Sequence, residues 1–587
     1  MKALAPSGLL PLAVDEGATT PAPTHTAVVW STLLGCVMYW DGQRWTAGAG
    51  GRQMASAGLR MAIIGASTEA RAHPMWSGTA AQYQRVSGVV TVTVDYILAN
   101  YPMLPGKEIR IGCGNRPDVE GRFAITSCSV AAGSSMTITY PDARPDVAAG
   151  TLGGGIDLHD VSCYTVSGGF PAHLNLCMGG RLELEVIATS GTNLVTDWGD
   201  ARVDQLVARG HFDVILIGTG VIGNTINAFG AGPAVAFSAL KTLIEKLRDR
   251  CAPRLVLVET PSASRTITPA SSVYTTAQAL LRRMWTELPR LYPFVRVVPC
   301  SEAMIQNYSA HNAAPSEDVA NGWPELAALA DDGVHAAYPW SAVRGEVLAD
   351  TLLRHMAPHI SPEMGVLPDT NLVNTALDPD GGKNRNYAQG LWGNVAGTQV
   401  TISSTGCSGV APAGSAISFT AGRGTSTAVS ALSTNPRGGT RWAITIDGKG
   451  SASGYTLQAD RAPSWLLDML NDPAVQGKYL DWFTPLSVQC GDLKLIYADV
   501  KLMATAGGVE YTLAAPLANQ GQFHQAGILR GMDAGFAGVL RAPRFKVPIA
   551  SFTAASIRVT VKEVNGSVAS GRTVVTWEAG ERFHLID

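Results

Sequence analysis

The chain has 587 residues, of which 46% are hydrophobic and 16% are charged, with 63 glycines and 33 prolines. This length exceeds what one hydrophobic core organises, so we expect three or four domains. The composition excludes a disordered chain and favours compact domains with many turns and much β structure. The formal net charge is −3 and no run of Lys or Arg stands out, which argues against nucleic acid or an anionic membrane as the main partner.

The nine cysteines are scattered along the chain, and none forms a C-x-x-C pair. A zinc site or a thioredoxin-like redox motif is therefore not expected, and buried free thiols in a protein folded in a reducing cytoplasm are the simpler interpretation. We expect neither a cofactor nor a metal. The N-terminus has Lys2 and a short apolar patch, but Asp15 and Glu16 follow at once, so we do not expect a signal peptide. The most apolar early stretch, 27–40, is too short to span a bilayer, so we expect no membrane insertion.

Residues 1–58 form an N-terminal unit rich in Pro, Gly, Thr and Ala. Its apolar run TAVVWSTLLGCVMYW meets an Asp-Gly pair and is followed by Arg-Trp, which predicts a β-hairpin with an Asp-Gly turn. The segment MYWDGQRW also resembles short segments near the ends of phage tail-fibre and tailspike modules. This resemblance implies a tail-fibre-like β segment.

From residue 59 the pattern changes to short buried strands that alternate with helices. Compact apolar runs predict strands at 61–65, 184–188, 214–217, 255–258 and 295–298, and the 3.6-residue period predicts helices at 237–247, 275–288 and 341–355. This alternation predicts an α/β domain with a doubly wound parallel sheet, whose site lies at the carboxyl ends of the strands. We assign residues 59–79 and 160–362 to this domain.

Two β-rich regions complete the chain. In residues 80–159, strand-like runs at 89–97, 108–112, 123–130 and 136–140 predict a small β-module inserted into the α/β domain. In residues 363–587 the helical pattern fades, apart from 464–472, and Gly, Ser, Thr and Val dominate. We expect one or two β-sandwiches there, as a carbohydrate-binding or trimerisation region.

Three short motifs lie at the ends of predicted strands. The sequence GAST places Ser67 on a tight strand-to-helix turn, where the helix N-terminus favours a developing oxyanion. The sequence VIATSG ends in Gly191, whose backbone N–H can approach a substrate oxygen without interference from a side chain. The sequence DGVH carries Asp332 three residues before His335, a spacing that can hold the imidazole in the tautomer that faces a serine.

Each motif alone has a simpler explanation. The first two occur as ordinary turns, and the third reads as an acidic turn with a solvated histidine, where Asp331 also competes for the role of Asp332. The three together, in the order Ser, Gly, Asp-x-x-His and each at a strand end, are far less expected by chance.

Residues 61–79 and about 160–355 resemble the SGNH (GDSL) hydrolases. IIGAST is similar to the family's Gly-Asp-Ser block, ATSG to its Gly block and DDGVH to its Asp-x-x-His block, while FDVILIGTGVIGN occupies the place of its Gly-x-Asn block. The resemblance implies an SGNH-hydrolase-like, flavodoxin-like sheet with Ser67 as nucleophile. His335 would be general base and acid, Asp332 its orienting partner, and the N–H groups of Ser67 and Gly191 would bind the oxyanion.

The chain departs from the family pattern at two positions. Ala66 replaces the aspartate before the serine, and Gly220 stands where the family has its oxyanion asparagine. Losing one oxyanion donor typically costs about 10²–10³ in rate, so a weakened site is one interpretation. Asn224 is the candidate to fill the vacant place in the oxyanion hole, and the alternative is a loop asparagine that satisfies local backbone.

Other residues receive simpler interpretations. His73 is read as a loop histidine rather than a second base, and residues 378–382, DPDGG, as a turn because they lack the downstream glutamate of a calcium loop. Five tryptophans of the C-terminal region are expected in the core rather than on a sugar-binding surface, namely Trp392, Trp442, Trp465, Trp482 and Trp577.

The combined resemblances imply a phage tailspike-type serine esterase that removes O-acetyl groups from bacterial surface polysaccharide, either O-antigen or capsule. They imply a homotrimer in the virion, made in the host cytoplasm and attached to the phage tail or baseplate through the N-terminus; a secreted or extracellular protein is the alternative. Two other functions stay open: a catalytically degenerate glycan-binding receptor, and a bacterial carbohydrate esterase with accessory binding domains.

Overall fold

The protein is described from a computed structural model. The structure describes five short N-terminal strands and the residues 59–70, 74–95, 104–113, 116–131, 135–161, 163–165, 170–178, 182–226, 229–260, 280–300, 338–356, 399–404, 406–420, 427–434, 440–448, 455–490, 496–518, 528–529, 536–563, 571–578 and 582–586. The chain divides into two compact units, Met1–Gly58 with Met356–Met364, and Leu59–His355 with Gly365–Asp587.

The smaller unit contains an antiparallel sheet in the order β2-β1-β3-β4-β5. Its strands are β1 (Lys2–Leu4), β2 (Pro11–Ala13), β3 (Val28–Ser31), β4 (Cys36–Trp40) and β5 (Trp45–Ala47). β4 and β5 pair with Trp40 opposite Trp45, which confirms the two strands of the predicted hairpin. The Asp-Gly turn between them lies outside the described residues.

The larger unit contains the predicted parallel sheet. Its strands are β6 (Leu59–Gly65), β15 (Leu182–Ala188), β16 (Val214–Ile217), β17 (Leu255–Glu259) and β18 (Val295–Val298). All neighbours are parallel in the order β15-β6-β16-β17-β18, which by chain order is 2-1-3-4-5, the flavodoxin-like arrangement. All five predicted strands are confirmed. The central strand β6 is buried throughout, as its unbroken apolar run requires.

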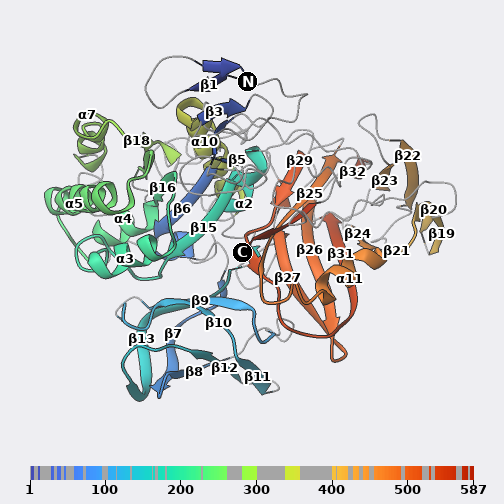
Figure 1. The fold of residues 1–587 in the computed structure, drawn as a ribbon, viewed down its shortest axis with the longest axis horizontal. Helices are drawn as coiled ribbons and strands as arrows, with labels where there is room; N and C mark the ends of the chain where they lie inside the picture. Colours follow the sequence, from blue (N-terminus) through green and yellow to red (C-terminus); the bar gives the residue numbers. More distant parts are fainter. Residues whose placement is uncertain are drawn as a thin grey trace, which may run out of the picture. The chain divides into compact units, whose positions relative to one another are not determined.

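Helices pack beside this sheet, as Figure 1 shows for α3, α4 and α5. The helices are α1 (Ser67–Ala70), α2 (Phe170–Cys177), α3 (Asp200–Ala208), α4 (Thr219–Ile226), α5 (Pro233–Cys251), α7 (Leu288–Leu291) and α10 (Tyr338–Met356). One core joins apolar side chains of β6, β16 and β17 to those of α3, α4 and α5. The helices predicted at 237–247 and 341–355 are confirmed within α5 and α10, and 280–285 of the third predicted helix is helical.

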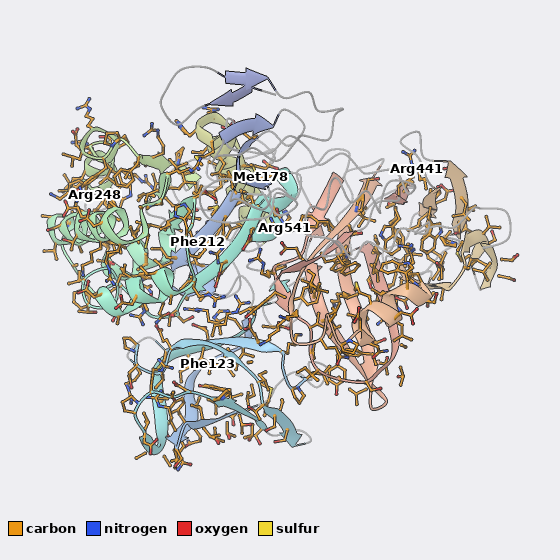
Figure 2. The ribbon with its side chains drawn as sticks, viewed as in Figure 1. Phe123, Met178, Phe212, Arg248, Arg441 and Arg541 are labelled. Atoms are coloured by element: carbon orange, nitrogen blue, oxygen red, sulfur yellow. The ribbon has the colours of Figure 1, made fainter. Side chains whose placement is uncertain are left out.

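The inserted module is a seven-stranded antiparallel sheet in the order β10-β9-β13-β7-β8-β12-β11. Its strands are β7 (Pro74–Val86), β8 (Val89–Asp95), β9 (Glu108–Cys113), β10 (Gly121–Ala124), β11 (Ser127–Ala131), β12 (Ser135–Pro141) and β13 (Val147–Asp160). The rings of Phe123 and Tyr140 stack in its core with centroids 4.3 Å apart. Figure 2 labels Phe123 within this module.

The prediction of four strands in this module was wrong in two respects. The run at 123–130 is two strands, because Ile125 N–H donates to Lys107 O while Thr126 N–H donates to Thr139 O, so the chain changes partner between these residues. The long strands β7 and β13 were not predicted, since their register is interrupted by bulges and their sequences do not alternate regularly. β7 begins at Pro74, ahead of the expected boundary at 80.

The C-terminal region is built around two sheets. The first contains β14 (Cys163–Thr165), β21 (Ser415–Thr420), β24 (Thr456–Arg461), β26 (Ile496–Ala506), β27 (Val509–Ala518), β28 (Ile528–Leu529) and β31 (Phe552–Glu563). The second contains β19 (Gln399–Ser404), β20 (Cys407–Pro412), β22 (Thr427–Thr434), β23 (Thr440–Gly448), β25 (Tyr479–Cys490), β29 (Phe536–Arg541), β30 (Phe545–Lys546), β32 (Gly571–Glu578) and β33 (Arg582–Ile586). The predicted helix is confirmed as α11 (Ser464–Asn471).

The tryptophans of this region that the structure describes are mainly core residues. Trp442, Trp482 and Trp577 are at most 1% exposed, and the rings of Trp442 and Trp577 stack with centroids 5.3 Å apart. Trp465 is half-buried and meets Phe583 edge-on. Trp392 lies outside the described residues. The core interpretation is therefore confirmed for the three buried side chains.

Three general features can be stated for the described part of the chain. Cys113, Cys300 and Cys407 are buried cysteines, and Cys177 and Cys251 are partly buried free thiols. None of the helices in these ranges has both the length and the hydropathy needed to cross a bilayer. Nor do three or more His, Cys, Asp or Glu side chains among these residues gather in a way that would hold a metal ion.

Candidate active site

Ser67 lies where the chain leaves the central strand of the parallel sheet. It is the first residue of α1, one residue beyond the end of β6 with Ala66 between them, and it is half-buried while its neighbours Ala66 and Thr68 are buried. The next two strands of this sheet in chain order, β15 and β16, pair with β6 on opposite sides. Ser67 therefore occupies the topological switch point, where open α/β sheets place their ligands.

Hydrogen bonds fix the loops after these three strands to one another. Gly65 O accepts the N–H of Thr189 at 3.3 Å and the hydroxyl of Thr192 at 3.0 Å, both from the loop after β15. Ile64 O accepts the N–H of Gly218, which follows β16, at 2.9 Å. The loop after β15 and the turn after β16 are thus held against the end of the strand that carries Ser67.

Gly191 and Asn224 lie at the same edge of the sheet. Gly191 has φ +81°, a left-handed conformation that favours glycine, in the loop after β15. The Asn224 side-chain amide donates to Thr192 O at 3.1 Å, so in this structure it supports that loop from α4. Its role as an oxyanion donor stays a prediction.

The remaining predicted site residues cannot be placed. Asp332 and His335 lie outside the described residues, as do Asp331, His73 and the segment 378–382. Helix α10 begins at Tyr338, three positions after His335 in the sequence. Of the predicted triad, the structure therefore describes Ser67, together with helix α10, which follows His335 in the sequence.

A buried ionic cluster lies beneath this edge, and we call Arg344, Glu69 and Glu259 the Arg344 cluster. The Arg344 guanidinium, from α10, donates through Nη2 to Glu69 Oε1 at 2.5 Å and through Nε to Glu259 Oε1 at 2.6 Å. A further bond joins Nη2 to Glu259 Oε2. All three side chains are 0% exposed, and the guanidinium lies 3.7 Å above the centre of the Phe170 ring.

The carboxylates of the cluster bind backbone groups of the site loops. Glu69 accepts the N–H of Ala66 at 2.9 Å and that of Gly220 at 3.2 Å, and Glu259 accepts the N–H of Thr219 at 2.7 Å. The cluster therefore connects the turn after β6, the turn after β16, the end of β17 and helix α10.

Glu69 also explains the glycine at 220. A Cβ added there would lie 2.5 Å from Glu69 Oε2 and 2.9 Å from Thr68 Cβ. Gly65 and Gly218 are equally tight, with added Cβ atoms 2.1 Å and 2.3 Å from the Glu69 side chain. The asparagine of the family pattern does not fit at this position while Glu69 is packed there.

Burial sets the protonation behaviour of the cluster. Desolvation raises the pKa of Glu69, Arg344 opposes this, and the charge of Glu259 adds to the rise. Burial alone would lower the pKa of Arg344, but Glu259 and Glu69 overcome it and raise this pKa. The guanidinium is thus held charged between two carboxylates.

A cavity of about 240 Å³ lies elsewhere on the same sheet. It is lined at the amino ends of β6 and β15 by Arg60 and Glu183, whereas Ser67 lies beyond the carboxyl end of β6. Its charged walls already pair with one another, as in the bond from Arg60 to Glu183 at 3.0 Å and that from Arg544 to Glu183 at 3.0 Å. We interpret this cavity as a gap within a structural network of ion pairs rather than as the active site.

Comparison with known proteins gives only weak structural matches. No protein-family model matches the chain, and no curated protein matches it. Matching solved structures include a peptidoglycan O-acetylesterase, 14% identical over 51% of this chain and 93% of that one with a TM-score of 0.26. A carbohydrate esterase family 3 protein from Talaromyces cellulolyticus is 11% identical over 33% of this chain and 92% of its own, with a TM-score of 0.25.

A carbohydrate-binding module of the β-sandwich superfamily also matches. It is 11% identical, and the match covers 30% of this chain and 57% of the chain that contains the module, with a TM-score of 0.19. TM-scores of 0.19 to 0.26 are too low to establish a shared fold. The flavodoxin-like fold stated above rests on the strand order and pairing of this chain.

Sequence reasoning missed Glu69, Glu259 and Arg344. A charged residue at the end of an otherwise apolar strand, such as Glu259 after LVLV, is the pattern that points to a buried partner. The partner itself was not identifiable, because Arg344 is 275 positions from Glu69 in the sequence.

Proposed function

We propose that this protein is a phage tailspike-type serine esterase that removes O-acetyl groups from bacterial surface polysaccharide. The observation that carries the proposal is the position of Ser67, half-exposed at the helix N-terminus that follows the central strand of a 2-1-3-4-5 parallel sheet. An activated serine on a strand-to-helix turn is an arrangement that acyl-transferring hydrolases use.

In the proposed mechanism His335, oriented by Asp332, takes the Ser67 proton as Oγ attacks the ester carbonyl. The backbone N–H groups of Ser67 and Gly191 bind the oxyanion of the tetrahedral intermediate. Its collapse transfers the proton from His335 to the departing sugar oxygen and leaves an acetylated serine. Water, deprotonated by His335, then releases acetate and restores Ser67.

The proposal extends to the context of the enzyme. The N-terminal unit would attach the protein to a phage tail or baseplate, and the β-rich C-terminal region would bind the polysaccharide or form a homotrimer. Localisation in the virion follows from this assignment. A monomer in solution, measured by light scattering at micromolar concentration, would contradict the tailspike part of the proposal.

One observation favours a second function. Gly220 has no side chain to stabilise an oxyanion, and Glu69 blocks any Cβ at that position. A catalytically degenerate, glycan-binding receptor with the same fold would tolerate this loss of about 10²–10³ in rate.

Acetate release separates the two functions. Purified protein is incubated with p-nitrophenyl acetate and with O-acetylated polysaccharide, beside Ser67→Ala and the control Ser238→Ala, an exposed position on α5. The proposal predicts turnover in the wild type and in Ser238→Ala, and background rates in Ser67→Ala. Equal background rates in all three proteins on both substrates would refute the esterase.

A further inference from the structure

The inserted β-module binds the loop that carries Gly191, residues 188–192, which we call the 188–192 loop. Asp157 of β13 is 0% exposed, and its two carboxylate oxygens both face Ser190. Oδ2 accepts the Ser190 N–H at 2.6 Å, and Oδ1 accepts the Ser190 hydroxyl at 2.8 Å. The residue directly before Gly191 is therefore held by a side chain of the module.

A second contact holds the beginning of the same loop. Arg110 of β9 donates to Ala188 O and, at 3.0 Å, to Thr189 Oγ1. The Thr189 hydroxyl donates in turn to Glu120 Oε1 at 2.9 Å, and Glu120 pairs with Arg202 of α3 at 2.9 Å. Four buried polar groups thus connect the module, the loop and the α/β domain.

The backbone of the module also approaches this loop closely. A Cβ added at Gly112 of β9 would lie 2.8 Å from Thr189 Oγ1 and 3.1 Å from its Cγ2. On its other side the loop is fixed to the nucleophile strand, because Thr192 Oγ1 donates to Gly65 O. The 188–192 loop is therefore clamped between the module and the strand that leads to Ser67.

We propose that the inserted module is a structural part of the active site and that Asp157 is a positioning residue, which holds the Gly191 N–H for the oxyanion. This inference rests on the proposed function. Gly220 supplies no side-chain donor, and the Asn224 amide is bonded to Thr192 O, so the proposed oxyanion site relies on the backbone N–H groups of Ser67 and Gly191. The value of such donors comes from being held in place before the reaction. Asp157 supplies that restraint through a charge-assisted bond to the adjacent peptide.

The test compares Asp157→Ala, Asp157→Asn and Ser190→Ala with the wild type. The matched control is Asp142→Ala, because Asp142 is a buried acid of the same module that pairs with Arg85 at 2.6 Å and Arg144 at 2.7 Å, away from the 188–192 loop. Hydrogen exchange of a peptide covering 186–194 reports the loop, and kcat and KM for p-nitrophenyl acetate report catalysis.

Asp157→Ala should speed amide exchange in this peptide about 10- to 100-fold and lower kcat by a similar factor, with KM within about two-fold. Asp157→Asn should recover part of both, since its side-chain oxygen still accepts the Ser190 N–H, and Ser190→Ala should show a smaller loss. Asp142→Ala should leave the loop and kcat unchanged.

Unchanged loop exchange in Asp157→Ala would overturn the inference, as would the same losses in Asp142→Ala, which would indicate general loosening of the module. The exchange readout needs no turnover. A wild type without Ser67-dependent hydrolysis refutes the proposed function, whereas an unaltered loop in Asp157→Ala refutes the inference, whatever the rate of hydrolysis.

Discussion

Replacing Arg344 by methionine removes a positive charge that lies between two buried carboxylates. In the structure Arg344 contacts Glu69 at 2.5 Å and Glu259 at 2.6 Å, and all three side chains are 0% exposed. Removing one partner of a buried ion pair costs about 3–5 kcal/mol, because the charge left behind is neither solvated nor compensated. We expect Arg344→Met to weaken the attachment of α10 by about this amount.

The loss should depend on pH in a defined direction. The pKa of Glu69 is already raised by burial, and Arg344 opposes that rise, so its removal raises this pKa further. A folded-state pKa above the unfolded value gives stability at low pH that is lost as the pH rises through the folded pKa. Arg344→Met should therefore be less destabilised at pH 5 than at pH 8, and Glu69→Gln in the same chain should relieve part of the loss.

Hydrogen exchange of peptides covering α10 measures this effect locally. A loss of about 3–5 kcal/mol corresponds to exchange about 10²–10⁴ times faster than in the wild type at the same pH. Arg354→Met is the control, since Arg354 lies on α10 in an exposed pair with Asp350. Exchange in Arg344→Met that equals the wild type, or that is unaffected by pH and by Glu69→Gln, would refute the reasoning.

Three further predictions concern other parts of the fold. Burial lowers the pKa of His173 to about 4, so the unfolded chain gains a proton between pH 6.5 and 4 that the folded chain does not. Urea titrations should therefore show the free energy of unfolding falling by up to about 3 kcal/mol as the pH falls from 6.5 to 4, and a His173→Asn variant with the same pH dependence would contradict this. Gly220→Asn should lower the melting temperature without raising esterase activity, because its Cβ would meet Glu69; a more active variant would show that the site accommodates the amide. Trp442→Ala should lower the free energy of unfolding in urea titrations by about 3–5 kcal/mol and leave polysaccharide affinity unchanged, since the side chain is 1% exposed and stacked on Trp577. Weaker binding by a variant that remains folded would overturn the assignment of Trp442 to the core.

The parallel sheet was predictable because its strands are local apolar runs. β16 and β18 coincide with the predicted 214–217 and 295–298, and β6, β15 and β17 extend their predicted runs by one or two residues. A strand that is buried on both faces needs a continuous run of apolar residues, and such a run can be recognised without knowledge of the strand's neighbours. The position of Ser67 at a strand end followed from the same local pattern.

The supports of the site were not predictable, because they join residues that are distant in the sequence. Asp157 and Ser190 are 33 positions apart, and they belong to different domains of the predicted organisation. A buried acid in the run GGGIDLHD has no local pattern that names its partner. The bulged strand β13 that carries it also lacks the regular alternation on which strand prediction depends.

The central claim is that Ser67 is an activated nucleophile, and covalent labelling tests it most directly. The protein is treated with a fluorophosphonate, which phosphonylates activated serines with loss of fluoride, and the modified residue is located by peptide mass spectrometry. The account predicts one added phosphonyl group per chain, on Ser67, and none in Ser67→Ala. A wild type that stays unlabelled, or a label on another serine, would contradict it.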